Sequence, residues 1–456
     1  MASKYGDGNF SVQIRSRELV TVAIPLPELW LPLSNIDLAV PAAYPSYFFV
    51  YTKPHCDLAA MISTLKKALS KLLAAFYPLA GVMVTNPVGE NELHCNHRGI
   101  EFIEAYADVK LCNLNLHDPR ASLKGKLVAP ASMEGAVVIL QVTELTCGGV
   151  VMSCTTDHRI CDLYSTNMFL EAWAEMARTG TISVMPSFRR SLLSPRRPGL
   201  SSKLIDHETY VALPPSLPPA VSHVPSVGNQ VSRIYLMRAQ DMEKIQALAS
   251  YHGARRSKLE ALSGCLWKAV AKTASSGDTC KLGISVDGRS ALIQDGGSRA
   301  AMDRYFGNVL SCPHGELDAD ELRKRPLSWV ADRIHEFLET TTTKEYFLGL
   351  IDWFEASRPY PVLPKVFCRG RKDGLSLVVS HGRPFHVKKL DFGWGKPAVG
   401  SIYFPDDSCV GYVMPLPTPS ENGDWVIFMN VFQHQLESIE AELGDVLHPL
   451  SVEHLN

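Results

Sequence analysis

The stretch VVMSCTTDHRICD, residues 150–162, organises the first half of this 456-residue chain. The apolar and β-branched run 150–156 predicts a buried strand, and His158 follows directly where that strand ends. After Asp162, apolar residues recur at helical spacing from Met168 to Met176. The order is therefore strand, histidine, helix, and ligand-binding or catalytic side chains favour loops at such element ends.

The HxxxD spacing alone is not specific. With 15 histidines, about one copy is expected by chance in a chain of this length, and His314 with Asp318 makes a second copy. His314 lies in a polar Pro-His-Gly-Glu stretch, whereas His158 caps an apolar run. A structural histidine bonded to a loop carbonyl stays the alternative to a catalytic base at position 158.

The second informative stretch is Asp391-Phe-Gly-Trp-Gly395. Five specified residues that include tryptophan arise by chance about once in ten thousand sequences of this length. Glycines on both sides of a large aromatic residue predict a tight turn over which backbone packs. We therefore expect Asp391, Gly393, Trp394 and Gly395 to support the site structurally, with Trp394 packed away from the pocket.

The two stretches resemble the HxxxD and DFGWG signatures of the BAHD family of plant acyl-CoA-dependent acyltransferases. Further similar segments are 31–37 (LPLSNID), 76–81 (FYPLAG), 186–193 (PSFRRSLL), 286–290 (VDGRS) and 305–308 (YFGN). The resemblance implies an α/β fold with two chloramphenicol-acetyltransferase-like domains of mixed sheets and helices, joined by a long crossover loop. It also implies a solvent channel between the domains, with the motif histidine at its middle.

A proline-rich segment separates two α/β halves. Eight prolines lie between Pro186 and Pro225, without sustained periodicity. This predicts an N-terminal domain over 1–185 that carries HxxxD, a linker over 186–228, and a C-terminal domain over 229–456 that carries DFGWG. Hydrophobic periodicity predicts helices at 58–76, 259–273, 327–338 and 433–443, and strands at 137–142, 150–156, 375–380, 401–404 and 425–431.

Composition restricts the class of protein. Apolar residues make up 46% of the chain, enough for a large core, and 47 acidic against 45 basic residues give no net charge that favours nucleic acid. An 18-residue apolar run and an apolar signal segment are both missing, so we expect no membrane span and a cytoplasmic protein. The 11 cysteines form no CxxC pair, which fits a reducing compartment. Relatives of this kind are usually monomers.

Acyl transfer from a thioester needs one base. The attacking hydroxyl or amine must lose its proton as it adds, and imidazole suits that role at neutral pH. We expect His158 to be this base, with acyl-CoA as co-substrate, no tightly bound cofactor and no metal. Because no acyl-enzyme is required, Cys161 is interpreted as a packing residue.

Other site residues follow from the resemblance. Asp162 either orients His158 or forms a structural salt bridge with an arginine of the other domain, and the resemblance favours the salt bridge, with Arg289 as partner. The amide of Asn308 is a candidate oxyanion donor, with a turn-forming role as the alternative. Arg255, Arg256, Ser257 and Lys258 precede a helix and are candidates for binding the CoA phosphates, although a solvated helix start has the same pattern.

The acceptor is the least determined part. Leu163 stands where most relatives have glycine or alanine, and Ser380 with His381 lies in a stretch that borders the acceptor site in relatives but lacks the tryptophan of shikimate-using members. The pattern is nearest the branch that acylates coniferyl-type alcohols, so a phenylpropanoid alcohol is expected. An amine acceptor and a non-catalytic binding protein of the same fold stay open. Asp391-Phe-Gly393 also resembles a kinase motif, but it lies too far from His158-Arg159, and a GxGxxG loop and a VAIK-like lysine strand are missing. The HExxH motif of zinc enzymes and the GxSxG elbow of hydrolases are missing as well.

Overall fold

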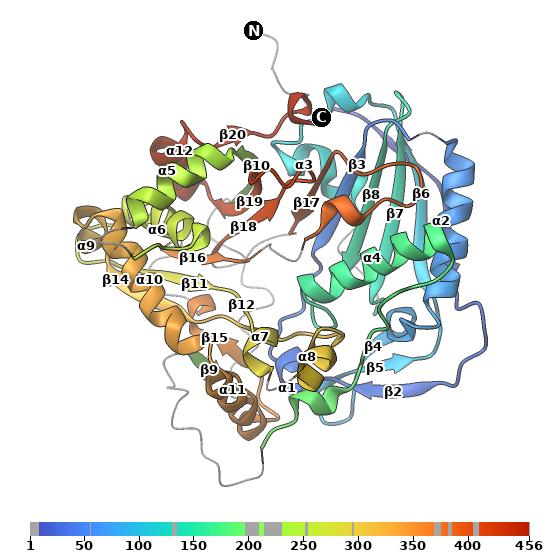
Figure 1. Ribbon diagram of the computed structural model, residues 1–456, viewed down its shortest axis with the longest axis horizontal. Helices are drawn as coiled ribbons and strands as arrows, with labels where there is room; N and C mark the ends of the chain where they lie inside the picture. The colour runs from blue at the N-terminus through green and yellow to red at the C-terminus, as the bar shows by residue number, and fades with distance from the viewer. Residues whose placement is uncertain are drawn as a thin grey trace.

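The computed structural model describes residues 9–54, 56–129, 135–196, 209–213, 230–250, 254–293, 296–368, 375–381, 385–404 and 410–455. Two bodies, each centred on a mixed β-sheet, lie side by side (Figure 1). This confirms the expected α/β class with two sheet-centred units.

The first body is built on a six-stranded sheet in the order β1-β6-β7-β8-β3-β17. Only β6 and β7 are parallel neighbours; the other pairs are antiparallel. Its central strands β3 and β8 are buried at every position, which matches their continuous apolar runs. The bounds are β1 (Val12–Val20), β3 (Ser46–Tyr51), β6 (Ile100–Ala107), β7 (Val138–Leu145), β8 (Val150–Thr156) and β17 (Val399–Tyr403).

Two helices, α2 (Leu58–Leu72) and α4 (Leu163–Thr179), lie against this sheet (Figure 1). The apolar face of α2 places Leu65 and Leu69 in the same core as Phe169 and Trp173 of α4. The predicted helix at 58–76 ends earlier, at Leu72, because the chain turns into a short 3-10 helix, η1 (Tyr77–Ala80), with proline in its first turn. Asp162 caps α4, which fixes the distance between the end of β8 and the helix.

The second body is a seven-stranded sheet in the order β14-β11-β16-β18-β19-β10-β20. Its strands are β10 (Gln230–Met237), β11 (Thr279–Ile284), β14 (His314–Asp318), β16 (Ser376–Val379), β18 (Gly411–Pro417), β19 (Trp425–Phe432) and β20 (His448–Pro449). Helices α5 (Ala239–Ala249), α6 (Lys258–Ala271), α9 (Ala319–Lys324), α10 (Leu327–Thr341) and α12 (Gln433–Leu443) share its core. The helices predicted at 259–273, 327–338 and 433–443 are confirmed with small shifts at their ends.

The remaining elements lie outside the two main sheets. These are the helices α1 (Asn35–Leu38), α3 (Pro119–Ser122), α7 (Arg289–Leu292), α8 (Gly296–Met302) and α11 (Lys344–Ser357), and the strand pairs β12 (Val286–Asp287) with β13 (Leu310–Ser311) and β9 (Tyr210–Ala212) with β15 (Val362–Pro364). A three-stranded sheet joins β2 (Leu29–Pro32), β5 (Asn91–Cys95) and β4 (Val82–Thr85). None of the helices in the described ranges is long and apolar enough to cross a bilayer.

One strand of the C-terminal half belongs to the first sheet. Strand β17 pairs antiparallel with β3, so the segment 385–404 packs with the N-terminal half of the chain. The predicted division into 1–185, 186–228 and 229–456 stays a prediction, and it does not describe this crossing. Of the predicted linker, 197–208 and 214–229 lie outside the described residues, while β9 pairs with β15 of the second half.

The DFGWG stretch fixes the entry of the chain into β17. Asp391 Oδ1 accepts the backbone N–H groups of Gly393 (2.8 Å) and Gly395 (3.1 Å), and both glycines have left-handed φ angles, +115° and +108°. Trp394 is buried and stacks on Phe392, at 5.5 Å between ring centroids. The turn is therefore packed into the first core through its aromatic residues.

Replacing Gly395 with alanine should destabilise the protein without changing the chemistry. An added Cβ meets no atom within 4 Å, so the cost is the φ of +108°, about 1–3 kcal/mol in unfolding free energy. Urea unfolding measures that loss, and kcat per folded molecule should equal that of wild type. A Gly395→Ala protein with normal unfolding and a lower kcat would instead place this turn at the reacting groups.

Candidate active site

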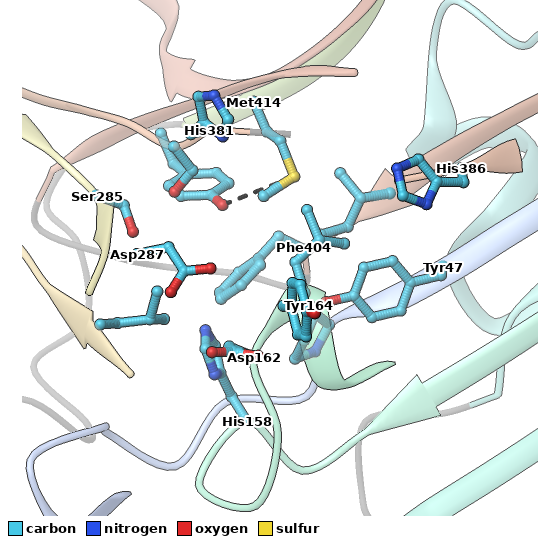
Figure 2. A pocket seen from close by; sticks show the side chains of 16 residues that line it. Tyr47, His158, Asp162, Tyr164, Ser285, Asp287, His381, His386, Phe404 and Met414 are labelled. Atoms are coloured by element: carbon cyan, nitrogen blue, oxygen red, sulfur yellow. Dashed lines mark hydrogen bonds between the residues drawn. The ribbon is translucent and has the colours of Figure 1, made fainter. Parts of the chain in front are cut away.

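His158 lies in the turn between β8 and α4, and its main chain is held from two sides. Its N–H donates to the carbonyl of Ala43 (2.9 Å), and its carbonyl accepts from Asn308 Nδ2 (2.9 Å). Nδ1 is buried and has no hydrogen-bond partner among the described residues. Since the side chain lines a cavity, Nε2 is the ring nitrogen that reaches it, and Figure 2 shows the imidazole pointing into that space.

The cavity has a volume of about 340 Å³, within the range of pockets for small molecules. One part of its wall is apolar, with four aromatic rings, and comprises Pro45, Tyr47, Leu163, Tyr164, Leu310, Ile402, Phe404, Tyr412 and Met414. The polar lining residues are His158, Asp162, Ser285, Asp287, Ser380, His381 and His386 (Figure 2). The arrangement suits a small, flat, mostly apolar ligand that carries polar groups.

A second and larger recess, of about 930 Å³, adjoins this cavity. The two spaces share Tyr164 and His386, and the second runs along α4 toward Lys389 and Lys396. A substrate too large for the first cavity therefore has room beyond it.

Asp162 and Arg289 form a buried ion pair between the two halves of the chain. Asp162 Oδ2 accepts from Arg289 Nη1 at 2.7 Å and Oδ1 accepts from Nη2 at 3.1 Å, a bidentate geometry. The backbone N–H groups of Ser165 and Val309 also donate to this carboxylate. Its partners do not include His158, so the structure brings Asp162 to the arginine that the sequence indicated and not to the imidazole.

A second carboxylate shares the same guanidinium. Asp287 Oδ1 accepts from the backbone N–H of Arg289 (2.9 Å) and from Nη1 (3.2 Å), and its side chain keeps 31% of its surface exposed in the cavity. Two carboxylates thus face one cation. Burial, and then the nearby Asp162, raise the pKa of Asp287 against the opposing effect of Arg289.

The structure corrects the oxyanion assignment for Asn308. Both N–H bonds of its side-chain amide are already used, one to Asp37 Oδ1 (2.9 Å) and one to the carbonyl of His158. Asn308 is fully buried and does not line the cavity. An N–H with no free direction cannot donate to a developing oxyanion, so Asn308 does not fit that role.

The four candidate CoA-binding residues lie together at the start of α6, and they do not line the cavity. Arg256 pairs with Asp332 (2.8 Å), and Ser257 forms a capping box with Glu260. Glu260 therefore places a carboxylate where a phosphate is expected to bind. Arg255 is exposed and Lys258 half-buried, so the cations of this group that remain candidates are these two.

Some of the other predicted residues line the cavity and others lie away from it. Leu163, Ser380 and His381 line the cavity, whereas the DFGWG residues do not. Burial raises the pKa of the Cys161 thiol to about 12, so no thiolate forms beside His158. His314 and Asp318, the second HxxxD copy, form strand β14 at the edge of the second sheet. No metal site of three or more His, Cys, Asp or Glu occurs within the described ranges.

Sequence reasoning missed much of the cavity wall. Tyr47, Phe404 and Tyr412 come from, or directly follow, three strands that are distant in sequence. An alternating strand pattern shows which residues face inward, but it does not distinguish a packed core from a cavity wall. Asp287 lies in the segment 286–290 that the sequence analysis quoted, but only Arg289 of that segment was predicted as a site residue.

Replacing Asp162 with asparagine should strongly destabilise the protein. The change leaves the guanidinium of Arg289, which is only 5% exposed, without its bidentate partner, and breaking a buried pair in this way costs about 3–5 kcal/mol. Urea or guanidinium unfolding measures the loss. An Asp162→Asn protein that unfolds like wild type but turns over slowly would favour the role of orienting His158.

Replacing Asp287 with asparagine should have the opposite effect on stability. The raised pKa means that wild type loses stability as pH rises through that pKa, so removing the charge should raise the unfolding free energy at neutral pH. The amide oxygen still accepts from Arg289. Unfolding measured across pH should show this gain shrinking on acidification, when the wild-type carboxyl becomes protonated. A loss of stability at neutral pH contradicts this reading.

Comparisons with known proteins agree over almost the whole chain. The model of the family described as "Transferase family" matches residues 10–445. Shikimate O-hydroxycinnamoyltransferase from Nicotiana tabacum is 25% identical, over 95% of this chain and 99% of its own length. Hydroxycinnamoyl-CoA:5-hydroxyanthranilate N-hydroxycinnamoyltransferase from Avena sativa is also 25% identical, over 96% of this chain and 100% of its own.

Among solved structures, vinorine synthase shares the fold, with a TM-score of 0.71, 20% identity, and coverage of 96% of this chain and 99% of that chain. The signatures, the two-body architecture and the family match lead to one assignment. The chain belongs to the Transferase family of plant BAHD proteins and is an acyl-CoA-dependent O- or N-acyltransferase.

Proposed function

We propose that this protein moves an acyl group from an acyl-CoA thioester to the hydroxyl of a small aromatic alcohol of phenylpropanoid type, with His158 as general base and no covalent acyl-enzyme. The observation that carries the proposal is the imidazole of His158, which lies at the end of β8 and reaches, through Nε2, a cavity with four aromatic rings in its wall. No metal or resident cofactor enters the reaction.

The reaction needs one proton to move twice. His158 Nε2 takes the proton of the acceptor hydroxyl as its oxygen adds to the thioester carbonyl, giving a tetrahedral intermediate. The intermediate expels the CoA thiolate, which takes the proton back from the imidazolium, and the ester is formed. The thiol of Cys161 takes no part, because it is buried and does not line the cavity.

The aromatic acceptor is supported by the cavity itself. Tyr47, Tyr164 and Phe404 present rings to a space of about 340 Å³, which suits one substituted aromatic ring more than a large polycyclic molecule. The names of the Nicotiana and Avena relatives both specify hydroxycinnamoyl transfer, so a hydroxycinnamoyl-CoA is the first donor to test. Of the residues at the start of α6, Arg255 and Lys258 are the proposed contacts for the CoA phosphates.

An amine acceptor is the second candidate, and one feature favours it. Asp287 adds a carboxylate to the cavity that Arg289 neutralises only in part, and such a group attracts an ammonium ion. A bound ammonium ion must first lose one proton to solvent, because only the neutral amine has a lone pair for attack. The same base then takes the second proton as the nitrogen adds to the thioester carbonyl. A panel of alcohols and amines, matched in ring structure, distinguishes the two products by mass.

Replacing His158 with alanine should lower kcat by about 10²–10⁴-fold, the usual contribution of a general base. The measurement is release of free thiol from acetyl-, benzoyl- and hydroxycinnamoyl-CoA in the presence of the acceptor panel, with product confirmed by chromatography. A folded His158→Ala protein with wild-type turnover contradicts the proposal.

His314→Ala is the matched control. His314 has the same HxxxD spacing, and its Nδ1 is also buried without a partner among the described residues, but it lies in β14 away from the cavity. Its replacement should leave kcat unchanged. If both variants lose activity equally, the loss reflects general destabilisation and His158 is not shown to be the base.

A further inference from the structure

Three of the segments that carry the family resemblance have no role in the reaction as described so far. They are 31–37, 186–193 and 305–308, and the structure brings one polar residue from each to a single buried place. These residues are Asp37 of α1, Arg190 of the 3-10 helix η4 (Arg190–Leu193), and Asn308 of the loop before β13. The place adjoins the main chain of His158.

Asp37 is the centre of this network. It is fully buried, and its Oδ2 accepts from the backbone N–H (3.0 Å) and the hydroxyl (2.8 Å) of Ser34, while Arg190 Nε lies 3.3 Å away. Its Oδ1 accepts from both the backbone N–H (2.8 Å) and the side-chain Nδ2 (2.9 Å) of Asn308. Every lone-pair direction of the carboxylate is thus used to fix neighbours.

The amide of Asn308 has only one orientation that works. Asp37 Oδ1 and the carbonyl of His158 are both acceptors, so the NH₂ group must face them and a flipped amide would set oxygen against oxygen. Its own Oδ1 is buried without a partner among the described residues. Both N–H groups of the amide therefore have acceptors, whereas its oxygen is buried without a donor among the described residues.

Arg190 contacts both Asp37 and the loop that carries Asn308. Its guanidinium donates to the carbonyl of Phe306 and, at 3.3 Å, to the hydroxyl of Tyr305. Gly307 leaves the space it needs, because a Cβ there would lie 2.6 Å from Arg190 Nη1. The loop that carries Asn308 is thus fixed against η4 before it reaches His158.

We infer that Asn308 is a positioning residue for the reaction, set by Asp37 and Arg190, which holds the carbonyl of His158 and thereby the height of its imidazole in the cavity. Opposite this contact, the N–H of His158 is held by Ala43. Nδ1 has no partner among the described residues, so no side-chain hydrogen bond from those residues to that nitrogen sets the ring. The main chain must do so instead. The inference rests on the proposed role of His158 as base.

The test is Asn308→Ala, with kinetics and thermal unfolding measured together. We expect kcat to fall about 10-fold or more while KM for acyl-CoA and acceptor changes less than about threefold, because a misplaced base costs rate and not binding. In a His158→Ala background the same change should have no further effect on the residual rate, since the amide acts through that imidazole.

Gln141→Ala is the control for general damage. Gln141 is a buried amide of β7 that also donates to a main-chain carbonyl, that of Lys126 (2.7 Å), and it does not line the cavity. It should lower the unfolding temperature by a similar amount and leave kcat unchanged. An unchanged kcat in Asn308→Ala, an equal loss in Gln141→Ala, or losses that multiply with His158→Ala would each overturn the inference.

The two proposals fail differently. If His158→Ala retains activity, the base assignment is wrong. If His158→Ala is inactive while Asn308→Ala turns over normally, the base assignment stands and only the positioning inference is lost.

Discussion

The buried pair of Asp162 and Arg289 is the constraint on which the site depends. It joins the cap of α4, in the first body, to the start of α7, which comes from the second half of the chain. A buried ion pair adds little net stability, because both charges lose water, but it tolerates few geometries. It therefore sets the relative position of β12 and the β8–α4 turn, and with it the position of the wall opposite His158.

Two polar connections, not one, place the turn between β8 and α4 that carries His158. The first holds the start of α4 through Asp162, and the second holds the carbonyl of His158 through Asn308 and Asp37. Both use charged groups that are almost fully buried, which natural proteins accept where a fixed geometry matters. Asp287 differs from Asp162 and Asp37, because the cation it contacts, Arg289, already forms a bidentate pair with Asp162. A carboxylate that lines the cavity and that we predict to lower stability is more readily explained by function than by folding.

Much of the fold and part of the site could be predicted from the sequence. The order of strand, histidine and helix around position 158, and the helices α6, α10 and α12, follow from periodicity, because local apolar spacing determines them. The partner of Asp162 came from resemblance and not from spacing. The engagement of Asn308 was not predictable, since its acceptors come from residues 37 and 158, and hydrogen bonds between segments so far apart leave no local pattern.

The crossing of β17 connects the second half of the chain to the sheet of the first body. This strand belongs by sequence to the second half and pairs with β3 of the first, and the residues after it, Phe404 and Tyr412, form part of the wall that faces His158. The DFGWG turn directs the chain into that strand, and its aromatic residues are anchored in the first core. A turn that never touches the cavity thus determines where the cavity wall stands. In this fold, a residue's distance from His158 is a poor measure of its importance for the shape of the cavity.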